Sequence, residues 1–173
     1  MPTQYTTWKK TKDLSDTDKQ HLITFVKENM KKEIDENFVK KMTLVIMAMK
    51  KQKIVGVVFL RKQDAHLRHV MFEVNALCVM KDKRGQGIGG NILNTAKEIV
   101  PERSFLQLYV DNDDNHDSLF YWYKFHGFHV VYRTCAETCM KTSVKKKTHK
   151  MTGLAICMIL ILMGCAMLIE FKK

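Results

Sequence analysis

The sequence predicts a mixed α/β fold, a sheet with helices on its faces, followed by one C-terminal transmembrane helix. Apolar runs typical of strands and segments with helical spacing follow one another in the order β-α-α-β-β-β-α-β-α-β-β. Helices interrupt the run of strands only in its second half, which favours a mixed sheet. Residues 151–169 carry no charged side chain, and a run of about 20 such residues can cross a bilayer.

The first half of the chain is expected to begin with a short strand, Tyr5–Lys9. Ser15 then has the residue type and position of a helix N-cap. From there to Val39 apolar residues recur every fourth position, which predicts one long helix or two consecutive ones. The runs Met42–Met49 and Ile54–Leu60 predict an antiparallel hairpin, and Gly56 inside the second run indicates a bulge or a close approach of backbone.

The second half is expected to alternate strands and helices around a glycine-rich loop. A long strand, His69–Met80, leads into this loop, and the helix that follows ends before Pro101. The remaining elements are predicted as a strand at Phe105–Val110, a helix at His116–His126 stopped by Gly127, and strands at Phe128–Arg133 and Thr138–Thr142.

Composition narrows the choice of partners. The formal net charge is +11 over 173 residues, so phosphate, nucleic acid or an anionic membrane surface is expected nearby. Nucleic acid is disfavoured because the basic residues lack interleaved aromatic side chains. The cysteines are odd in number and show no metal-ligand spacing, so we expect reduced thiols, a cytosolic domain and no metal site. The cysteines are Cys78, Cys135, Cys139, Cys157 and Cys165.

The C-terminal run predicts a membrane anchor. We divide the chain into a domain at 1–144, a basic segment at 145–150 and a transmembrane helix at 151–171. Four lysines precede the run and two follow it, so the positive-inside rule places the domain in the cytosol. Without an N-terminal signal sequence, this arrangement indicates a tail-anchored, single-pass protein on a membrane that the sequence does not identify. The alternatives for this run are a buried core helix and a helix that docks into a partner.

The stretch Arg84–Gly90 combines a basic residue with four glycines at the start of a predicted helix. Free N–H groups at a helix N-terminus bind phosphate, and glycine lets the phosphate approach the backbone. The order differs from both the Walker loop and the dinucleotide-binding fingerprint. The loop, read through Arg84, Gly87 and Gly89, resembles the acetyl-CoA loop of the GCN5-related N-acetyltransferase (GNAT) superfamily, whose pattern is Arg/Gln-x-x-Gly-x-Gly/Ala after a strand.

A second signature, Asn115–Phe128, resembles the family's Asn-x-x-Ala-x-x-x-Tyr-x-x-x-Gly-Phe, with Ser118 where Ala is usual. The predicted order of elements over residues 6–142 is also that of the family. The resemblance implies the GNAT fold, acetyl-CoA as co-substrate and an amine as acceptor. It places the pantetheine arm where two central strands splay apart. The cofactor-binding residues that it implies are Leu77, Cys78, Val79, Arg84, Gly85, Gln86, Gly87, Ile88, Gly89, Gly90 and Asn115.

Two residues are candidates for catalysis. Glu73 lies in an apolar strand, where a carboxylate is costly without a task or a partner. It falls at the position of the catalytic glutamate of the family's histone-acetylating members. It is therefore read either as the base or as a strand residue that pairs with a nearby basic residue or faces solvent. Asn75 is expected on the same face, where it could orient a water. Tyr123 matches the tyrosine that protonates the departing thiolate; its alternative is an amphipathic core residue. Cys78 is read as a core residue, and Asn115 as a helix cap that could also contact pantetheine.

These observations predict an acetyl-CoA-dependent N-acetyltransferase that transfers acetyl directly in a ternary complex while anchored to a lipid bilayer. The acceptor is a protein lysine, a protein N-terminus or a small amine. The alternative function is a catalytically weak acyl-CoA-binding or adaptor module on a membrane. The sequence carries no signal for one acceptor or for an oligomeric state.

Overall fold

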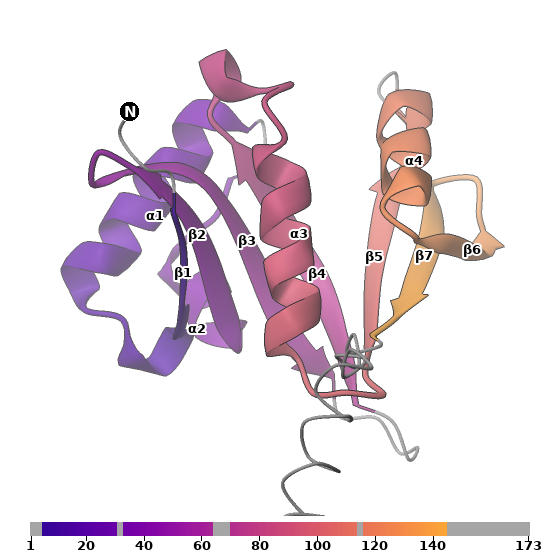
Figure 1. Ribbon diagram of the computed structural model, residues 1–173, viewed down its shortest axis with the longest axis horizontal. Coiled ribbons are helices and arrows are strands. Elements are labelled where there is room, and N and C mark those ends of the chain that lie inside the picture. Colours follow the sequence, from indigo (N-terminus) through magenta and orange to yellow (C-terminus); the bar gives the residue numbers. More distant parts are fainter. Residues whose placement is uncertain (1–4, 31–32, 64–69, 114–115, 145–173) are drawn as a thin grey trace, which may run out of the picture.

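The computed structural model describes residues 5–30, 33–63, 70–113 and 116–144. Within them a seven-stranded mixed sheet has the order β1-β2-β3-β4-β5-β7-β6 (Figure 1). The strands are β1 Tyr5–Lys10, β2 Leu44–Lys50, β3 Lys53–Gln63, β4 Met71–Val79, β5 Phe105–Asp111, β6 His129–Arg133 and β7 Glu137–Ser143. The helices are η1 Thr11–Asp13, α1 Asp16–Asn29, α2 Glu36–Lys41, η2 Lys81–Lys83, α3 Ile88–Ile99 and α4 His116–Phe125. The predicted element order and mixed α/β class are confirmed.

Two hydrophobic cores separate the helices into two layers. One core joins α1 and α2 to the sheet through residues such as Val57, Phe59 and Cys78. The other core joins α3 and α4 to the opposite face through residues such as Val58, Leu60 and Leu106. Because neighbouring residues of β3 alternate between the two cores, this strand is buried on both faces, which explains its continuous apolar run.

The apolar stripe that follows Ser15 forms two helices. The Ser15 side chain accepts a hydrogen bond from the Asp18 N–H at 3.1 Å, as its capping position predicts. A second cap, Asp35, accepts from the Phe38 N–H at 2.7 Å and starts α2. Because Asp35 starts a new helix, the stripe forms two consecutive helices rather than one long helix.

The β4 strand pairs with β5 along only part of its length. The parallel register covers Met71 with Phe105, Phe72 with Leu106 and Glu73 with Gln107. Beyond Glu73 the two strands diverge, and Figure 1 shows the sheet opening upward between β4 and β5. The opening leaves one edge of β4 unpaired in the middle of the sheet.

A β-bulge in β4 explains this divergence. Phe59 pairs with Ala76 and Leu60 with Val74, so Asn75 is the extra residue. A bulge bends its strand and increases the local twist. It also changes the face of the residues that follow: Val74 joins the core under α3, whereas Ala76 joins the core under α1. The prediction that Asn75 shares a face with Glu73 rested on strict alternation, which the bulge interrupts.

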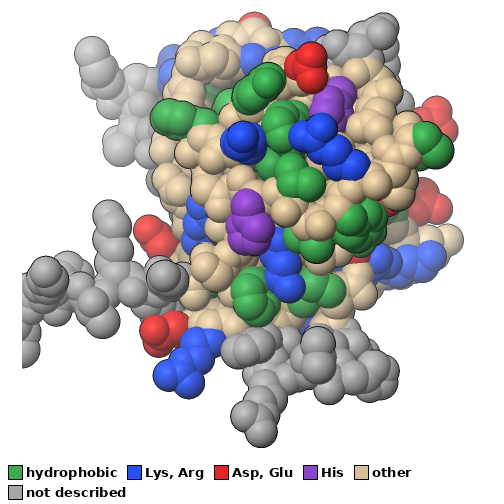
Figure 2. Space-filling view, turned by 90° about the vertical axis from the view of Figure 1, so that its right-hand side faces the viewer, with side chains coloured by type: hydrophobic (Ala, Val, Ile, Leu, Met, Phe, Trp, Pro, Cys, Tyr) green, Lys and Arg blue, Asp and Glu red, His purple; other side chains and the backbone are tan. Residues whose placement is uncertain are grey.

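The β6 strand forms an edge of the sheet and is exposed along its whole length. Its register with β7 skips Val131, so this edge also carries a bulge. Figure 2 shows the side of the molecule that includes α4 and β6, where hydrophobic side chains reach the surface among basic ones. The large exposed hydrophobic residues of these elements are Leu119, Tyr121, Phe125, Val130, Val131 and Tyr132.

None of the helices in the described stretches is long and apolar enough to cross a membrane. The predicted transmembrane helix at 151–171 and the basic segment at 145–150 lie outside the described residues, as do Asn115 and the start of the predicted strand at His69.

Replacing Gly56 with Ala should destabilise the contact of β3 with α3. A Cβ at Gly56 would lie 2.7 Å from Cδ1 of Ile92 and 2.9 Å from Cγ2 of Ile88. These methyl groups must shift within a packed core, so we expect a loss of about 1–3 kcal/mol in the free energy of unfolding. Urea denaturation followed by circular dichroism measures it. An unchanged urea midpoint would show that α3 can move away from β3 without loss of stability.

Candidate active site

The glycine loop connects the open end of β4 to α3. Gly85 and Gly87 both have φ of 76°. No atom lies within 4 Å of a Cβ built at either glycine, so glycine is needed there for the left-handed backbone. Gly87 is the N-cap of α3 and supplies no side-chain hydrogen bond. The first intrahelical bond runs from the Asn91 N–H to the Gly87 carbonyl, so the N–H groups of the preceding residues are available to a ligand.

The next two glycines serve packing. A Cβ at Gly89 would lie 3.1 Å from the Trp122 ring, and a Cβ at Gly90 would lie 2.6 Å from the His126 ring. Both rings belong to the α4 region, so the absence of side chains lets α4 approach the first turn of α3. The opening between β4 and β5 is therefore bordered by these two helices on one side of the sheet.

Arg84 ties the loop to the N-terminal half of the chain. Its Nη2 donates to the Asn29 carbonyl at 2.7 Å, and its Nε donates to the Val79 carbonyl at 3.3 Å. The Asn29 side chain is buried, accepts from the Lys81 N–H at 3.1 Å and donates to the Phe25 carbonyl at 2.9 Å. Asn29 thus fixes the loop to the end of α1. Sequence reasoning missed this residue, although a polar residue in the apolar-facing last turn of α1 was a usable signal.

The backbone N–H groups of Leu77, Cys78 and Val79, at the end of β4, do not all point the same way. The Met80 N–H donates to the Val55 carbonyl of β3 at 3.0 Å. Because peptide groups alternate along a strand, Cys78 also faces β3, whereas Leu77 and Val79 face the opening. The sequence-based prediction treated the three alike. The register assigns the outward N–H groups to Leu77 and Val79.

Cys78 is a buried thiol, as its reading as a core residue predicted. Burial raises the pKa of Cys78 to about 11, against the weaker opposing effects of Arg84 and Lys81. The thiol is therefore protonated near neutral pH and is a poor nucleophile.

Tyr123 lies in α4, partly buried beside the core under α3. Its ring makes edge contacts with Trp122 and Phe128 at centroid distances of 4.9 and 5.6 Å. Burial raises the pKa of Tyr123 to about 12, so its hydroxyl keeps its proton over the physiological range.

The helix that carries Tyr123 begins at His116. Counted back from Tyr123 and Gly127, the first position of the second signature falls at His116, one residue after Asn115. The His116 ring stacks on Phe120, and its Nε2 lies 3.1 Å from Oγ1 of Thr138 in β7. His116 therefore anchors the start of α4 to the sheet.

Glu73 has partners on the neighbouring strand. One of its carboxylate oxygens accepts from Arg61 Nη2 at 2.7 Å and from the Gln63 side chain. The Glu73 side chain is 13% exposed. The ion pair is the alternative to the catalytic role that the sequence left open. Both of these contacts fall on the same carboxylate oxygen, Oε2.

A polar and aromatic cluster continues the Glu73 face of the sheet across β5, β7 and β6. Gln107 pairs with Glu73 and donates from Nε2 to the Tyr109 hydroxyl at 2.7 Å. A hydrogen bond with Tyr109 raises the pKa of Tyr132 to about 12. Sequence reasoning missed these residues, although Gln107 and Tyr109 alternate with buried Leu106, Leu108 and Val110. That alternation marks a strand with one face uncovered.

No group of three potential metal ligands occurs in the stretches that the structure describes.

Comparison with known proteins identifies the family and the fold. Residues 11–142 match the family model described as an acetyltransferase (GNAT) domain. None of the curated proteins compared with the chain matches it.

Three solved structures illustrate the similarity of the fold. Naa50 of Arabidopsis thaliana, in complex with the bisubstrate analogue CoA-Ac-MVNAL, has 16% identity and a TM-score of 0.64 over 80% of this chain and 98% of its own. NAA60 of the same plant, with acetyl-CoA, has 11% identity and a TM-score of 0.63 over 81% and 100%. The ribosomal-protein-S18-alanine N-acetyltransferase of Escherichia coli has 15% identity and a TM-score of 0.63 over 85% and 99%.

Alkylation should discriminate the cysteines of the domain. With a pKa of about 11, Cys78 has roughly one thiolate in a thousand molecules at pH 8, and it is also buried. We expect iodoacetamide to modify the exposed Cys135 first and to reach Cys78 only after unfolding, as measured by peptide mass spectrometry. Equal rates for Cys78 and Cys135 in the folded protein would contradict the buried, protonated thiol.

Proposed function

Because the chain belongs to the GNAT acetyltransferase family, we propose that it transfers the acetyl group of acetyl-CoA directly to an amine at the opening between β4 and β5. The observation that carries the proposal is the position of the glycine loop at the unpaired end of β4. A phosphate-binding helix N-terminus and free strand N–H groups meet there, and this combination suits a ligand with a pyrophosphate at one end and a thioester at the other.

The loop would hold the pyrophosphate of acetyl-CoA through the N–H groups of Gly87, Ile88, Gly89 and Gly90. Gly85 and Gln86 shape the approach, and Lys81 and Lys83 add positive charge beside it. In this arrangement the Arg84 side chain acts on the loop, because both of its described hydrogen bonds run to protein carbonyls.

The unpaired edge of β4 would receive the pantetheine arm. The N–H groups of Leu77 and Val79 point into the opening, where they can pair with amide carbonyls of the arm and polarise the thioester carbonyl. Cys78 contributes packing from the α1 side of the sheet. No covalent enzyme intermediate is needed when the amine and the thioester meet in one complex.

Glu73 would accept the proton of the attacking amine, directly or through water. An amine such as lysine has a pKa of about 10.4, so most of it is charged at neutral pH and must lose a proton before attack. Arg61 and Gln63 hold the carboxylate in place.

Tyr123 would donate a proton to the departing CoA thiolate. The raised pKa of Tyr123 keeps its hydroxyl protonated. Burial also disfavours the charged CoA thiolate in the opening, which favours its protonation. The proton therefore moves from oxygen to sulfur as the carbon–sulfur bond breaks.

The acceptor would enter from the sheet face opposite α3 and α4, over Gln107, Tyr109 and Tyr132. That face is continuous with Glu73, so an amine lying on it can reach the base and the thioester together. The bisubstrate analogue in the Naa50 structure joins CoA to a peptide, which makes a peptide N-terminus a first acceptor to test, beside lysine side chains and small amines.

We also propose attachment to a membrane through residues 151–171, with the domain on the cytosolic side. The support is the uncharged run and the excess of lysines before it.

A catalytically weak acyl-CoA-binding module is the second candidate, and the Arg61–Glu73 ion pair is the observation that favours it. The two candidates separate in the Glu73→Gln variant. An enzyme with Glu73 as base should lose about 100-fold in kcat, whereas a binding module would show no turnover before or after the change.

Replacing Tyr123 with Phe should lower kcat by about 100-fold with little change in KM, because general acid catalysis is lost and packing is kept. Release of CoA thiol is measured with acetyl-CoA and peptide or polyamine amines. Tyr121→Phe is the matched control, since Tyr121 lies in the same helix and is 65% exposed. Equal rates in both variants would remove Tyr123 from the mechanism, and no activity in the parent protein with any amine would contradict the proposed enzyme.

The pH profile provides a separate check. The pKa of Tyr123 is raised to about 12, so its acid form is present below pH 10 and is lost only as the pH rises through 12. The rate should therefore climb with deprotonation of the amine and show no fall between pH 8 and 10. A falling limb that centres below pH 10 and disappears in Tyr123→Phe would contradict the raised value.

Tryptophan fluorescence should report cofactor binding. Trp122 contacts Gly89 at the proposed pyrophosphate site, and the second tryptophan, Trp8, lies in β1 and is exposed. Acetyl-CoA should change the emission of the parent protein and of Trp8→Phe, but not that of Trp122→Phe. A response that follows Trp8 instead would place the ligand elsewhere.

A further inference from the structure

Phe125 is the most exposed large hydrophobic side chain in the stretches that the structure describes. It lies at the end of α4 and is 86% exposed. An aromatic ring held in water forgoes the favourable free energy of burial, so a ligand that covers the ring gains affinity. The proposed steps of acetyl transfer give this ring no task.

The neighbours of Phe125 on α4 determine the direction in which its ring points. Phe120 and Tyr123 pack on the core between α4 and the sheet. Trp122 and His126 instead contact the first turn of α3. Successive residues of an α-helix are about 100° apart around its axis. Phe125 therefore points away from the sheet and borders the side of α4 that contacts α3.

A row of rings connects Phe125 to the proposed pyrophosphate site. The ring centroids of Trp122 and His126 are 4.4 Å apart, and those of His126 and Phe125 are 5.4 Å apart. A Cβ at Gly90 would lie 2.6 Å from the His126 ring, and the Gly90 N–H is one of the groups proposed to bind the pyrophosphate. Phe125 is thus separated from the phosphate-binding turn of α3 by one ring.

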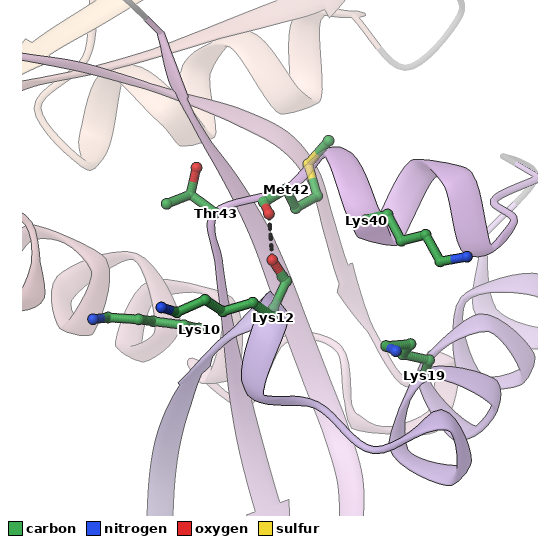
Figure 3. Close-up of a pocket in the computed structure, with 7 residues that line it drawn as sticks. Lys10, Lys12, Lys19, Lys40, Met42 and Thr43 are labelled. Carbon is green, nitrogen blue, oxygen red and sulfur yellow. Dashed lines mark hydrogen bonds between the residues drawn. The ribbon is translucent and has the colours of Figure 1, made fainter.

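A hollow of about 570 Å³ elsewhere on the molecule does not offer a comparable site. Its lining comes from the α1 and α2 side of the sheet and includes four lysines. Figure 3 shows Lys10 and Lys12 extending to one side and Lys40 to the other. Lys19 and Lys40 each have a carboxylate partner. These lysines therefore do not converge on one anion.

We infer that Phe125 stacks on the adenine base of acetyl-CoA. A single ribose joins the base to the pyrophosphate, so a pyrophosphate held at the first turn of α3 leaves the base close to that turn. Phe125 presents a flat apolar ring there, and every base has a π-face that can stack on such a ring. Stacking removes apolar surface of both rings from water. This inference rests on the proposed acetyl-CoA site but not on catalysis by Glu73 or Tyr123.

The test compares two ligands that differ in the base. CoA carries adenine, whereas 4′-phosphopantetheine has the same arm and a phosphate but no nucleoside. The full chain in phosphatidylcholine nanodiscs is titrated with each ligand by isothermal titration calorimetry. Phe125→Ala should weaken the binding of CoA about tenfold, as expected for the loss of one base–aromatic stack, and leave the binding of phosphopantetheine unchanged. Phe125→Trp should keep the affinity for CoA.

Tyr121→Ala is the matched control. Tyr121 is an aromatic residue of the same helix, is 65% exposed and lies one turn before Phe125, farther around the helix from α3. Its replacement should leave the affinities for both ligands unchanged. Circular dichroism confirms that the variants fold. In acetyl-transfer assays, Phe125→Ala should raise KM for acetyl-CoA about tenfold without changing kcat, because the stack is equally strong in the ground state and the transition state.

Equal affinities of the parent protein and Phe125→Ala for CoA would overturn the inference. An equal loss for CoA and phosphopantetheine would also overturn it, since the ring would then support the loop rather than the base. So would a loss that follows Tyr121→Ala instead. A dimer of the parent protein that Phe125→Ala dissociates, with no change in CoA affinity, would assign the ring to a contact between copies of the chain; light scattering measures this.

Failure of the proposed function gives a different set of results. Binding of CoA that depends on Phe125, without acetyl transfer to any amine, would contradict the enzyme and support the stack. Acetyl transfer with a KM that does not depend on Phe125 would contradict the stack alone. A parent protein that binds neither CoA nor phosphopantetheine would refute the acetyl-CoA site and, with it, both proposals.

Discussion

The loss of pairing between β4 and β5 is the constraint on which the rest of the site depends. A sheet normally satisfies every N–H and C=O of its central strands, and an unsatisfied buried group costs free energy. The bulge at Asn75 bends β4 so that its last residues keep β3 as a partner but lose β5. The freed edge is tolerable because it opens to solvent, and it becomes useful because a ligand can complete the missing ladder.

The two helices beside the opening keep it from closing. Gly89 and Gly90 let α4 lie close to the start of α3, and Trp122 and His126 fill the space that side chains on α3 would otherwise occupy. Lys97 adds a bond from Nζ to the His126 carbonyl at 2.6 Å. Burial lowers the pKa of Lys97 and that of His126, which fits a contact formed largely by packing. The opening is therefore maintained by helix packing on one face of the sheet, and the proposed acceptor surface lies on the other face.

Local chemistry made much of this arrangement predictable. Several local features predicted the elements that the structure contains. Ser15 and Gly127 marked helix ends, the apolar run marked β3, and the glycines marked the start of α3. The fold class followed from their order. What sequence could not indicate were the pairings between distant residues. Arg61 with Glu73 and Arg84 with Asn29 are separated by 12 and 55 residues, and a strand register is needed before either can be drawn.

The bulge shows why one regularity was insufficient. Alternation along β4 correctly gives the burial of Phe72 and Val74, but one extra residue reverses the assignment of every position after it. A similar shift of one residue separates Asn115 from His116 at the start of α4. The first shift is a property of the backbone, whereas the second follows from counting back from Tyr123 and Gly127 along the sequence.

The bond network around Asn29 couples ligand binding to thermal stability. Because Asn29 joins the last turn of α1 to Lys81 and Arg84, a ligand held by the glycine loop also holds α1 in its folded place. A ligand at 100 times its dissociation constant stabilises the folded state by about 2.7 kcal/mol. This increment would be shared by the helix that lies across the sheet from α3, so hydrogen exchange in α1 would slow when the loop is filled. The rate of hydrogen exchange in α1 would thus report whether a ligand occupies the glycine loop.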